Sequence, residues 1–274
     1  MDKKILISDF DGTLCDSSCQ VNEEILQMFR DLQKQNIIRV IATGRSLYSA
    51  YKVLENDFPI DYLIFSSGAG LMNWKTKQII FSACLSSNDT AIIASALNKK
   101  QIDYMIHHPI PDNHYFDYFL FNKCNSDFIS RLKHYSDYAL KADTLTYTHK
   151  KASQFLAITS YQANHEIFLS QTLDQFSVIR ATSPLDHQSK WIEIFPKHIS
   201  KSQTANYLCD LLSINQKNSM AIGNDFNDID LLNWAAKAYV VHNAHEDIKK
   251  QFHKVSSCHE NGIIEAVSHW LNQA

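Results

Sequence analysis

Short apolar runs alternate with an amphipathic stretch in the first quarter of the chain. Residues 4–8, 37–42 and 62–66 are rich in aliphatic side chains, which is typical of strands buried in a parallel sheet. Between the first two runs, residues 21–36 repeat apolar side chains at the helical spacing, and a second helical stretch follows around 47–54. The order strand, helix, strand, helix, strand predicts right-handed crossovers and a parallel sheet covered on both faces.

The alternation breaks after about residue 83. The segment that follows mixes helical stretches with aromatic-rich strand candidates, which favours an α+β unit with antiparallel strands. These elements are predicted at residues 88–100, 115–122, 127–135, 153–161 and 176–182. The parallel pattern is predicted to resume with the apolar run 191–195, before a helix opened by Ser200 and Gln203 as a capping box.

The pattern therefore predicts an α/β protein of two domains. The first is a discontinuous Rossmann-like parallel-sheet core, residues 1–83 and 188–274. The second is an inserted α+β cap domain, residues 84–187. A cap of this kind is expected to exclude water and to select the substrate.

Composition narrows the classes of partner. The chain has 274 residues, is 45% hydrophobic and 20% charged, and carries a formal net charge of −3. This balance argues against nucleic acid and anionic membranes as partners, and no apolar run approaches the roughly 18 residues of a transmembrane helix. The apolar stretch near the N-terminus is too short for a signal-peptide core. We therefore expect a cytoplasmic monomer or homodimer that contacts neither nucleic acid nor membrane.

The six cysteines are scattered and form no C-x-x-C pair. Reduced thiols of a cytoplasmic protein are the best interpretation. On sequence alone, Cys15 and Cys19 are expected to face each other only if their segment is helical.

Polar clusters follow the predicted strands at their carboxyl ends, where open parallel sheets bind ligands. These clusters are Asp9 with Asp11, then Thr43 with Gly44 and Arg45, then Ser66 to Gly68, and finally Asn224 to Asp228, with Lys201 at a nearby helix start. Carboxylates that converge repel each other, so their convergence needs a cation. Oxygen ligands without a Cys/His set favour Mg²⁺. Around such an ion, Thr43 and Lys201 suit a phosphoryl group.

Four stretches carry a resemblance: DFDGTL (9–14), ATGR (42–45), ISKSQTA (199–205) and IGNDFNDIDLL (222–232). Together they resemble the four motifs of the haloacid dehalogenase-like hydrolase superfamily. The insertion between the second and third motifs looks like the C2-type cap of its Cof-type, sugar-phosphatase-like branch. The resemblance implies a Mg²⁺-dependent phosphatase that hydrolyses a small phosphomonoester, a sugar phosphate or a phosphorylated cofactor, through an aspartyl-phosphate.

The resemblance also implies individual roles. Asp9 would be the nucleophile and Asp11 the general acid and base, with Thr43 binding the phosphoryl oxygens and Lys201 neutralising charge. Phosphate or substrate binding would fall to Gly12, Gly44, Arg45 and Asn227. Mg²⁺ would be held by Asp9, the backbone carbonyl of Asp11, Asn224 and Asp228.

Three positions leave alternatives open. Asn224 stands where the branch usually has its first acidic residue, so either Asn224 or Asp225 is the direct metal ligand. Ser67 stands where the branch usually has an asparagine. Arg45 either contacts the substrate or pairs with a carboxylate.

Other functions are compatible with the same residues. A phosphomutase or phosphotransferase would use the same aspartyl-phosphate, although familiar mutases place a smaller cap between the first two motifs. A phospho-accepting receiver domain would be about half this length. A non-catalytic phosphate-binding relative is the third alternative, because Asn224 removes one negative charge from the site.

Overall fold

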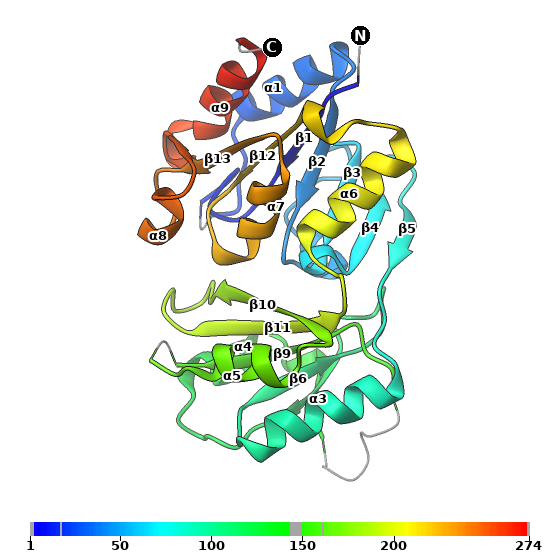
Figure 1. Ribbon diagram of the computed structural model, residues 1–274, viewed down its shortest axis with the longest axis vertical. Helices are drawn as coiled ribbons and strands as arrows, with labels where there is room; N and C mark the ends of the chain where they lie inside the picture. The colour runs from blue at the N-terminus through cyan, green and yellow to red at the C-terminus, as the bar shows by residue number, and fades with distance from the viewer. Residues whose placement is uncertain (1–2, 17, 143–149, 161, 273–274) are drawn as a thin grey trace. The chain divides into compact units, whose positions relative to one another are not determined.

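The structure is a computed structural model that describes residues 3–16, 18–142, 150–160 and 162–272. These residues form two compact units (Figure 1). The described residues within Met1–Arg45, Ser49–Phe81 and Ser200–Ala274 form the first unit, and those within Ser46–Tyr48 and Ser82–Ile199 form the second. The predicted fold class, a parallel-sheet α/β core with an inserted α+β unit, is confirmed.

The sheet of the first unit has the strand order β14-β13-β12-β1-β2-β3-β4-β5 over the described residues. Its strands are β1 (Ile5–Ser8), β2 (Ile38–Ala42), β3 (Tyr62–Phe65), β4 (Gly70–Asn73), β5 (Gln78–Ser82), β12 (Ser219–Gly223), β13 (Lys237–Val241) and β14 (His253–Val255). Strands β1 to β3 and β12 to β14 run parallel, whereas β4 returns antiparallel to β3. The order reverses between β1 and β12, which is where sheets of this kind bind ligands.

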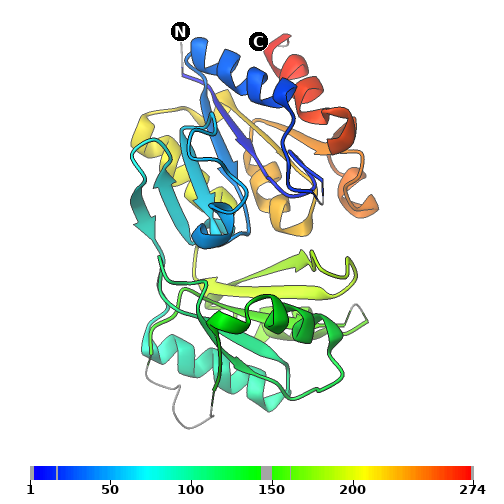
Figure 2. The same cartoon turned by 180° about the vertical axis from the view of Figure 1, so that it is seen from behind.

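Helices cover both faces of this sheet (Figures 1 and 2). Helices α1 (Glu23–Lys34) and α9 (Gly262–Asn272) pack side by side on one face, and α6 (Lys201–Leu212) and α7 (Ile229–Trp234) pack together on the other. Helix α1 begins where the side chain of Asn22 accepts a hydrogen bond from Ile25 N, and it buries Ile25, Phe29 and Leu32. That spacing of three and four residues produces the apolar stripe predicted for 21–36.

The second unit has a sheet with the order β10-β11-β9-β6-β7-β8 over the described residues. Its strands are β6 (Tyr104–His107), β7 (Phe116–Phe119), β8 (Ala139–Lys141), β9 (Gln154–Thr159), β10 (Phe176–Thr182) and β11 (Lys190–Pro196). Neighbouring strands are antiparallel except for β7 and β8. Its helices are α3 (Ser87–Lys99), α4 (Ser126–His134) and α5 (His165–Thr172).

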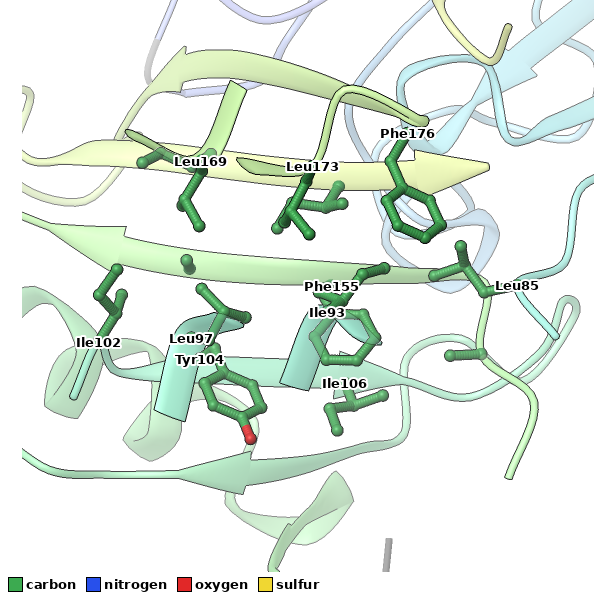
Figure 3. Packing of buried hydrophobic residues seen from close by; sticks show 14 of the residues in the cluster. Leu85, Ile93, Leu97, Ile102, Tyr104, Ile106, Phe155, Leu169, Leu173 and Phe176 are labelled. Atoms are coloured by element: carbon green, nitrogen blue, oxygen red, sulfur yellow. The ribbon is translucent and has the colours of Figure 1, made fainter. Parts of the chain in front are cut away.

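Both faces of the second sheet carry apolar side chains. On one face, Tyr104 and Phe155 pack with Leu97 of α3 in a cluster that also includes residues of α5 (Figure 3). On the other face, Leu156 packs in a cluster with Phe128 of α4. Because successive strand residues point to opposite faces, β9 contributes to both clusters.

Several short helices remain among the described residues. They are α2 (Leu47–Ala50), α8 (Glu246–Lys249), η1 (Ser66–Gly68), η2 (Ser136–Tyr138), η3 (Gln216–Asn218), η4 (Phe226–Asp228) and η5 (Cys258–Glu260). Among the described residues, no helix combines the length and the apolar character that a membrane span requires. Residue 161, the end of the predicted strand 153–161, lies outside the described residues.

The prediction that the parallel sheet resumes at 191–195 is wrong. Strand β11 pairs antiparallel with β9 and β10, so it belongs to the second unit. An apolar run shows that a strand is buried but does not identify its partner strands. Residues 188–199 therefore fall in the second unit rather than in the predicted core, and the return to the first unit comes at Ser200.

Candidate active site

The first two acidic residues follow β1 at the point where the strand order reverses. The register places Ser8 opposite Ile222 of β12 and Ile41 of β2, and Asp9 N then donates to Ile222 O over 2.9 Å. Asp9 is 5% exposed, whereas the side chain of Asp11 is 41% exposed. The two carboxylates are thus held at one strand end in different surroundings, one buried and one open to solvent.

Gly12 makes the turn after this strand. Its φ of +73° lies in the left-handed region, and a Cβ placed there would come within 2.4 Å of Asn224 Nδ2. A side chain at this position would therefore be strained by its backbone and would collide with the last cluster of the site. The predicted tight turn at Gly12 is present, and it brings the loop after β1 against the loop after β12.

Lys201 lies between two carboxylates. Its Nζ donates to Asp9 Oδ1 over 2.7 Å and to Asp228 Oδ1 over 2.6 Å, and Lys201 and Asp228 are fully buried. A cation at a helix N-terminus opposes the helix dipole. Here the two carboxylates provide the compensation, while Ser200 caps α6 by accepting from Gln203 N over 3.3 Å.

The loop after β12 is folded around Asp228. Its Oδ2 accepts hydrogen bonds from Asn224 N at 3.0 Å and Asp225 N at 3.1 Å, while Oδ1 receives Lys201. A Cβ at Gly223 would lie 2.5 Å from Asp228 Cγ, so this carboxylate packs directly against the strand end. The side chain of Asp225 caps the short helix η4. Asp228 is therefore held in place by the lysine and by two backbone amides.

One hydroxyl group faces two oxygen acceptors. Thr13 Oγ1 lies 3.2 Å from Asp9 Oδ2 and 3.2 Å from Asn224 Oδ1. A hydroxyl has one proton to donate, so it satisfies one of these two oxygens at a time. The other oxygen has a lone pair suited to a hard cation, and the donor set is made of oxygen only, as Mg²⁺ prefers. The residues present fit that ion.

Burial raises the pKa of the Asp9 carboxyl from 3.8 to about 7; the charge of Asp228 adds to this effect and Lys201 opposes it. For Lys201, burial acts to lower the pKa, but the charges of Asp228 and Asp9 outweigh burial and the pKa is raised. The ammonium group of Lys201 therefore stays charged, whereas burial makes ionisation of the neighbouring Asp9 carboxyl unfavourable. A second positive charge near Asp9 would relieve that cost.

Thr43, Gly44 and Arg45 follow β2, and Gly44 is the residue of this loop that lies close to the loops after β3 and β12. Thr43 is buried, and its Oγ1 accepts from Arg45 N over 3.1 Å. A Cβ at Gly44 would lie 3.4 Å from Ser67 Oγ and 3.6 Å from Asn227 Nδ2. Ser67 itself has φ +51°, and its N donates to Thr43 O over 3.0 Å. Three loops therefore present small polar groups around Gly44.

Arg45 pairs with a carboxylate, which is one of the two alternatives left open by the sequence. Its Nε donates to Asp11 Oδ2 over 2.8 Å and its Nη2 donates to Asp11 Oδ1 over 2.6 Å. Two parallel bonds of this kind are both strong and directional. The charge and hydrogen bonds of Asp11 raise the pKa of Arg45 although burial acts in the opposite direction.

One residue that supports the turn at Gly12 was not predicted from the sequence. Asn243 Nδ2 donates to Gly12 O over 2.7 Å, and its Oδ1 accepts from Cys258 N over 2.9 Å. The asparagine follows β13, so a fifth strand end contributes to the same edge of the sheet, after those of β1, β2, β3 and β12. Its position two residues after the end of an apolar strand is the signal that would have pointed to it.

The hydrogen bonds join the predicted residues in groups. One network contains Asp9, Lys201, Asn224 and Asp228, linked through Thr13. Asp11 and Arg45 form a separate pair, and the backbone of Arg45 continues to Thr43. The side chain of Asp225 caps η4.

The chain is similar to known proteins along most of its length. Residues 6–267 match the haloacid dehalogenase-like hydrolase family. Phosphatase YwpJ of Bacillus subtilis is 23% identical over 98% of this chain and 100% of its own length. From the same organism, 5-amino-6-(5-phospho-D-ribitylamino)uracil phosphatase YcsE is 21% identical over 99% of this chain and 97% of its own length.

Solved structures share the fold. The subclass IIB sugar phosphatase BT4131 superposes with a TM-score of 0.78 at 18% identity, covering 97% of this chain and 98% of its own. BT1666 from Bacteroides thetaiotaomicron superposes with a TM-score of 0.79 at 18% identity, covering 98% of this chain and 95% of its own.

Proposed function

The chain belongs to the haloacid dehalogenase-like hydrolase family, in the Cof-type branch that the resemblance implies. From this premise we propose that it is a Mg²⁺-dependent phosphatase that acts on a small phosphomonoester through an aspartyl-phosphate. The general class, a phosphatase of this family, follows from the family itself. The proposal that the reaction passes through an aspartyl-phosphate rests on the two contacts made by the carboxylate of Asp9. Lys201 holds Oδ1 at 2.7 Å, and Oδ2 points to Thr13 at the strand end.

Asp9 is the nucleophile of the proposed reaction. Its carboxylate attacks phosphorus, the bond from phosphorus to the ester oxygen breaks, and an aspartyl-phosphate forms. Lys201 favours this step because its charge stabilises the ionised carboxylate and then the negative charge that spreads over the phosphoryl oxygens. Because Lys201 is fully buried, this interaction is only weakly screened by water.

Asp11 is the general acid and base. It gives its proton to the leaving oxygen, and it takes a proton back from the water that attacks phosphorus in the second step. That second displacement breaks the bond between Asp9 and phosphorus and releases inorganic phosphate. The partial exposure of Asp11 supports this role, since both a leaving alcohol and a water molecule must reach it. Arg45 fixes the orientation of the carboxylate through its two hydrogen bonds.

Polar groups around Gly44 are proposed to bind the phosphoryl oxygens. Thr43 contributes its hydroxyl, and Asn227 contributes its amide from the adjacent loop. Gly12, whose left-handed backbone makes the turn after β1, and Gly44 are proposed to let the backbone approach the phosphoryl group.

Mg²⁺ is proposed to be held by Asp9, the backbone carbonyl of Asp11 and Asn224. Asp228 would complete the set either as a direct ligand or by fixing the loop that carries Asn224. When bound, the ion would neutralise charge on the phosphoryl oxygens and on Asp9. The side chain of Asp225 caps η4, which supports Asn224 as the direct ligand.

The substrate class is a small phosphomonoester with a polar leaving group. Two similar proteins act on phosphorylated compounds of this kind by their names, a sugar phosphatase and a phosphoribitylamino-uracil phosphatase. We propose a sugar phosphate or a phosphorylated cofactor for this chain, selected by the α+β unit as a C2-type cap. A cytoplasmic location and a monomeric or homodimeric state remain predictions.

Phosphate release from a panel of phosphorylated metabolites, with and without Mg²⁺, tests the proposal. We expect Mg²⁺-dependent turnover that Asp9→Asn abolishes, while the exposed carboxylate variant Asp31→Asn keeps it. Retention of near-normal turnover by Asp9→Asn would remove the nucleophile assignment. Phosphoryl transfer to a second product without net phosphate release would favour the phosphotransferase alternative, and no reaction with any ester would favour a non-catalytic protein.

A further inference from the structure

Two cysteine thiols lie beside the Asp11–Arg45 pair and have no part in the proposed reaction. Both are reduced in the structure. One ligand atom from each of Asp11, Cys15 and Cys19 lies within 4.8 Å of the other two. Cys19 Sγ also accepts a hydrogen bond from Arg45 Nη2 over 3.0 Å. This group of one carboxylate and two thiols is called the thiol cluster below.

The thiols meet without a helix, so the expectation that only a helical segment would let them face each other is wrong. Cys15 N lies 3.3 Å from Phe10 O, and Gly12 N donates to Cys15 O over 2.8 Å, which folds the chain tightly after β1. The turn continues with Asp16, whose Oδ1 accepts from Ser18 N and whose carbonyl accepts from Cys19 N. Cys19 has φ +57°, a backbone conformation that reverses the chain and returns its sulfur toward Asp11.

We propose that the thiol cluster is a binding site for a thiophilic divalent cation, with Zn²⁺ as the physiological candidate. Two thiolates and one carboxylate supply three ligands of the types that Zn²⁺ takes, and water supplies the fourth of a tetrahedral set. The separations are larger than those of a closed site, so the side chains must move inward on binding. Thiolate ligands favour Zn²⁺ and disfavour Mg²⁺, which keeps this site distinct from the oxygen site at Asp9.

The charge balance of the thiol cluster and its exposure to solvent agree with binding of a divalent cation. Binding releases the two thiol protons to solvent, so the cation and the two thiolates add no net charge to the neutral Asp11–Arg45 pair. Each carboxylate oxygen accepts more than one partner, which lets Asp11 keep Arg45 while it binds the ion. The partly exposed Asp11 gives an entry path.

A disulfide switch explains the same pair of thiols less well. Cys15 is 2% exposed, and burial, together with the charge of Asp11, raises the pKa of its thiol. A thiol of this kind reacts slowly with oxidants, whereas a thiophilic cation displaces the proton directly.

A bound cation would inhibit the phosphatase, a consequence that rests on the proposed function. Asp11 must give and take a proton during the reaction, and a carboxylate that ligates Zn²⁺ does so poorly. The expected inhibition is reversible by a chelator and persists in excess Mg²⁺.

Spectroscopy with Cd²⁺ as the probe tests the site independently of activity. In excess Mg²⁺, the wild-type chain should bind one equivalent of Cd²⁺ with the ultraviolet charge-transfer absorption of two thiolates. Since loss of an outer-sphere partner alone weakens metal binding by about 10- to 100-fold, we expect Cys15→Ser and Cys19→Ser to weaken Cd²⁺ binding by at least about 100-fold. Cys124→Ser, which removes an exposed thiol, should bind as the wild type does.

The Cd²⁺ titration and the inhibition assay test the cation site and its effect on activity separately. Absence of the absorption in the wild type, or its full retention in Cys19→Ser, would overturn the site. Cys19 is less buried than Cys15, so its variant decides the question even if Cys15→Ser does not fold. Cd²⁺ binding without Zn²⁺ inhibition of an active wild type would overturn the inhibition but not the site. A wild type that hydrolyses no phosphomonoester would contradict the proposed function, and the Cd²⁺ titration would still decide the site.

Discussion

Lys201 Nζ lies 2.6 Å from Asp228 Oδ1, and neither residue is exposed to solvent. The same ammonium reaches Asp9, so one buried cation balances two buried carboxylates. Breaking a buried ion pair from one side leaves an uncompensated charge, which costs far more than the loss of an exposed pair. The same ion-pair network therefore affects both the stability of the first unit and the charge state of Asp9, the proposed nucleophile.

Lys201→Met is expected to destabilise the Mg²⁺-free protein by about 3–5 kcal/mol and to abolish turnover, because Asp9 and Asp228 are then buried without an opposite charge. Adding Asp228→Asn to this variant should recover part of the stability, because it removes one of the two buried negative charges. The double variant should remain inactive. Chemical denaturation of the single and double variants measures both effects. Lys34→Met, on the exposed face of α1, serves as the control. A single variant as stable as the wild type would contradict the ion-pair argument.

Arg45→Lys is expected to lower kcat by about tenfold with little change in KM. Lysine cannot make the two parallel bonds to Asp11, and one charge-assisted hydrogen bond contributes about 1.5 kcal/mol or more. If Arg45 instead contacted the substrate throughout the reaction, KM would rise while kcat stayed nearly constant. Steady-state kinetics with Arg30→Lys, an exposed pair of α1, as the control distinguishes the two roles.

The sequence predicted much of the fold and several of the polar residues that the hydrogen bonds bring together, although it did not predict Asn243. Carboxylates such as Asp9 that directly follow apolar runs predicted the ligand-binding edge of a parallel sheet, and the family match confirms the resemblance drawn from the four motifs. The sheet to which β11 belongs could not be predicted, because burial alone does not choose between two sheets. The contact of Cys19 with Arg45 depends on a left-handed backbone at a non-glycine residue, which no local pattern indicates.

Asn224→Asp is expected to tighten Mg²⁺ binding by about tenfold or more, because a second full negative charge then faces the oxygen site beside Asp9. Asp225→Asn should leave the affinity nearly unchanged, since that carboxylate caps η4. The shift of the melting temperature with Mg²⁺ concentration gives both affinities. The opposite result, in which Asp225→Asn weakens binding and Asn224→Asp does not strengthen it, would make Asp225 the direct ligand.

The pH dependence of stability should report on Asp9. Its folded-state pKa of about 7 lies above the ordinary 3.8, so between these values the folded protein keeps a proton on Asp9 that the unfolded chain has lost. Stability from this group is therefore full at low pH and is lost as pH rises toward about 7. Relative to Asp9→Asn, the free energy of unfolding of the Mg²⁺-free wild type should fall by up to about 1.4 kcal/mol per pH unit in this window.

Urea unfolding of both proteins at several pH values, without Mg²⁺, measures this difference, and saturating Mg²⁺ should flatten the slope by stabilising the ionised carboxylate. Asp31→Asn on the surface should parallel the wild type within this window, because the hydrogen bond from Lys34 lowers the pKa of Asp31 and keeps its carboxylate ionised there. Parallel curves for wild type and Asp9→Asn would show that Asp9 is already ionised in the folded protein. Lys201 would then outweigh both burial and Asp228, and the cation would be needed for the phosphoryl group rather than for the nucleophile.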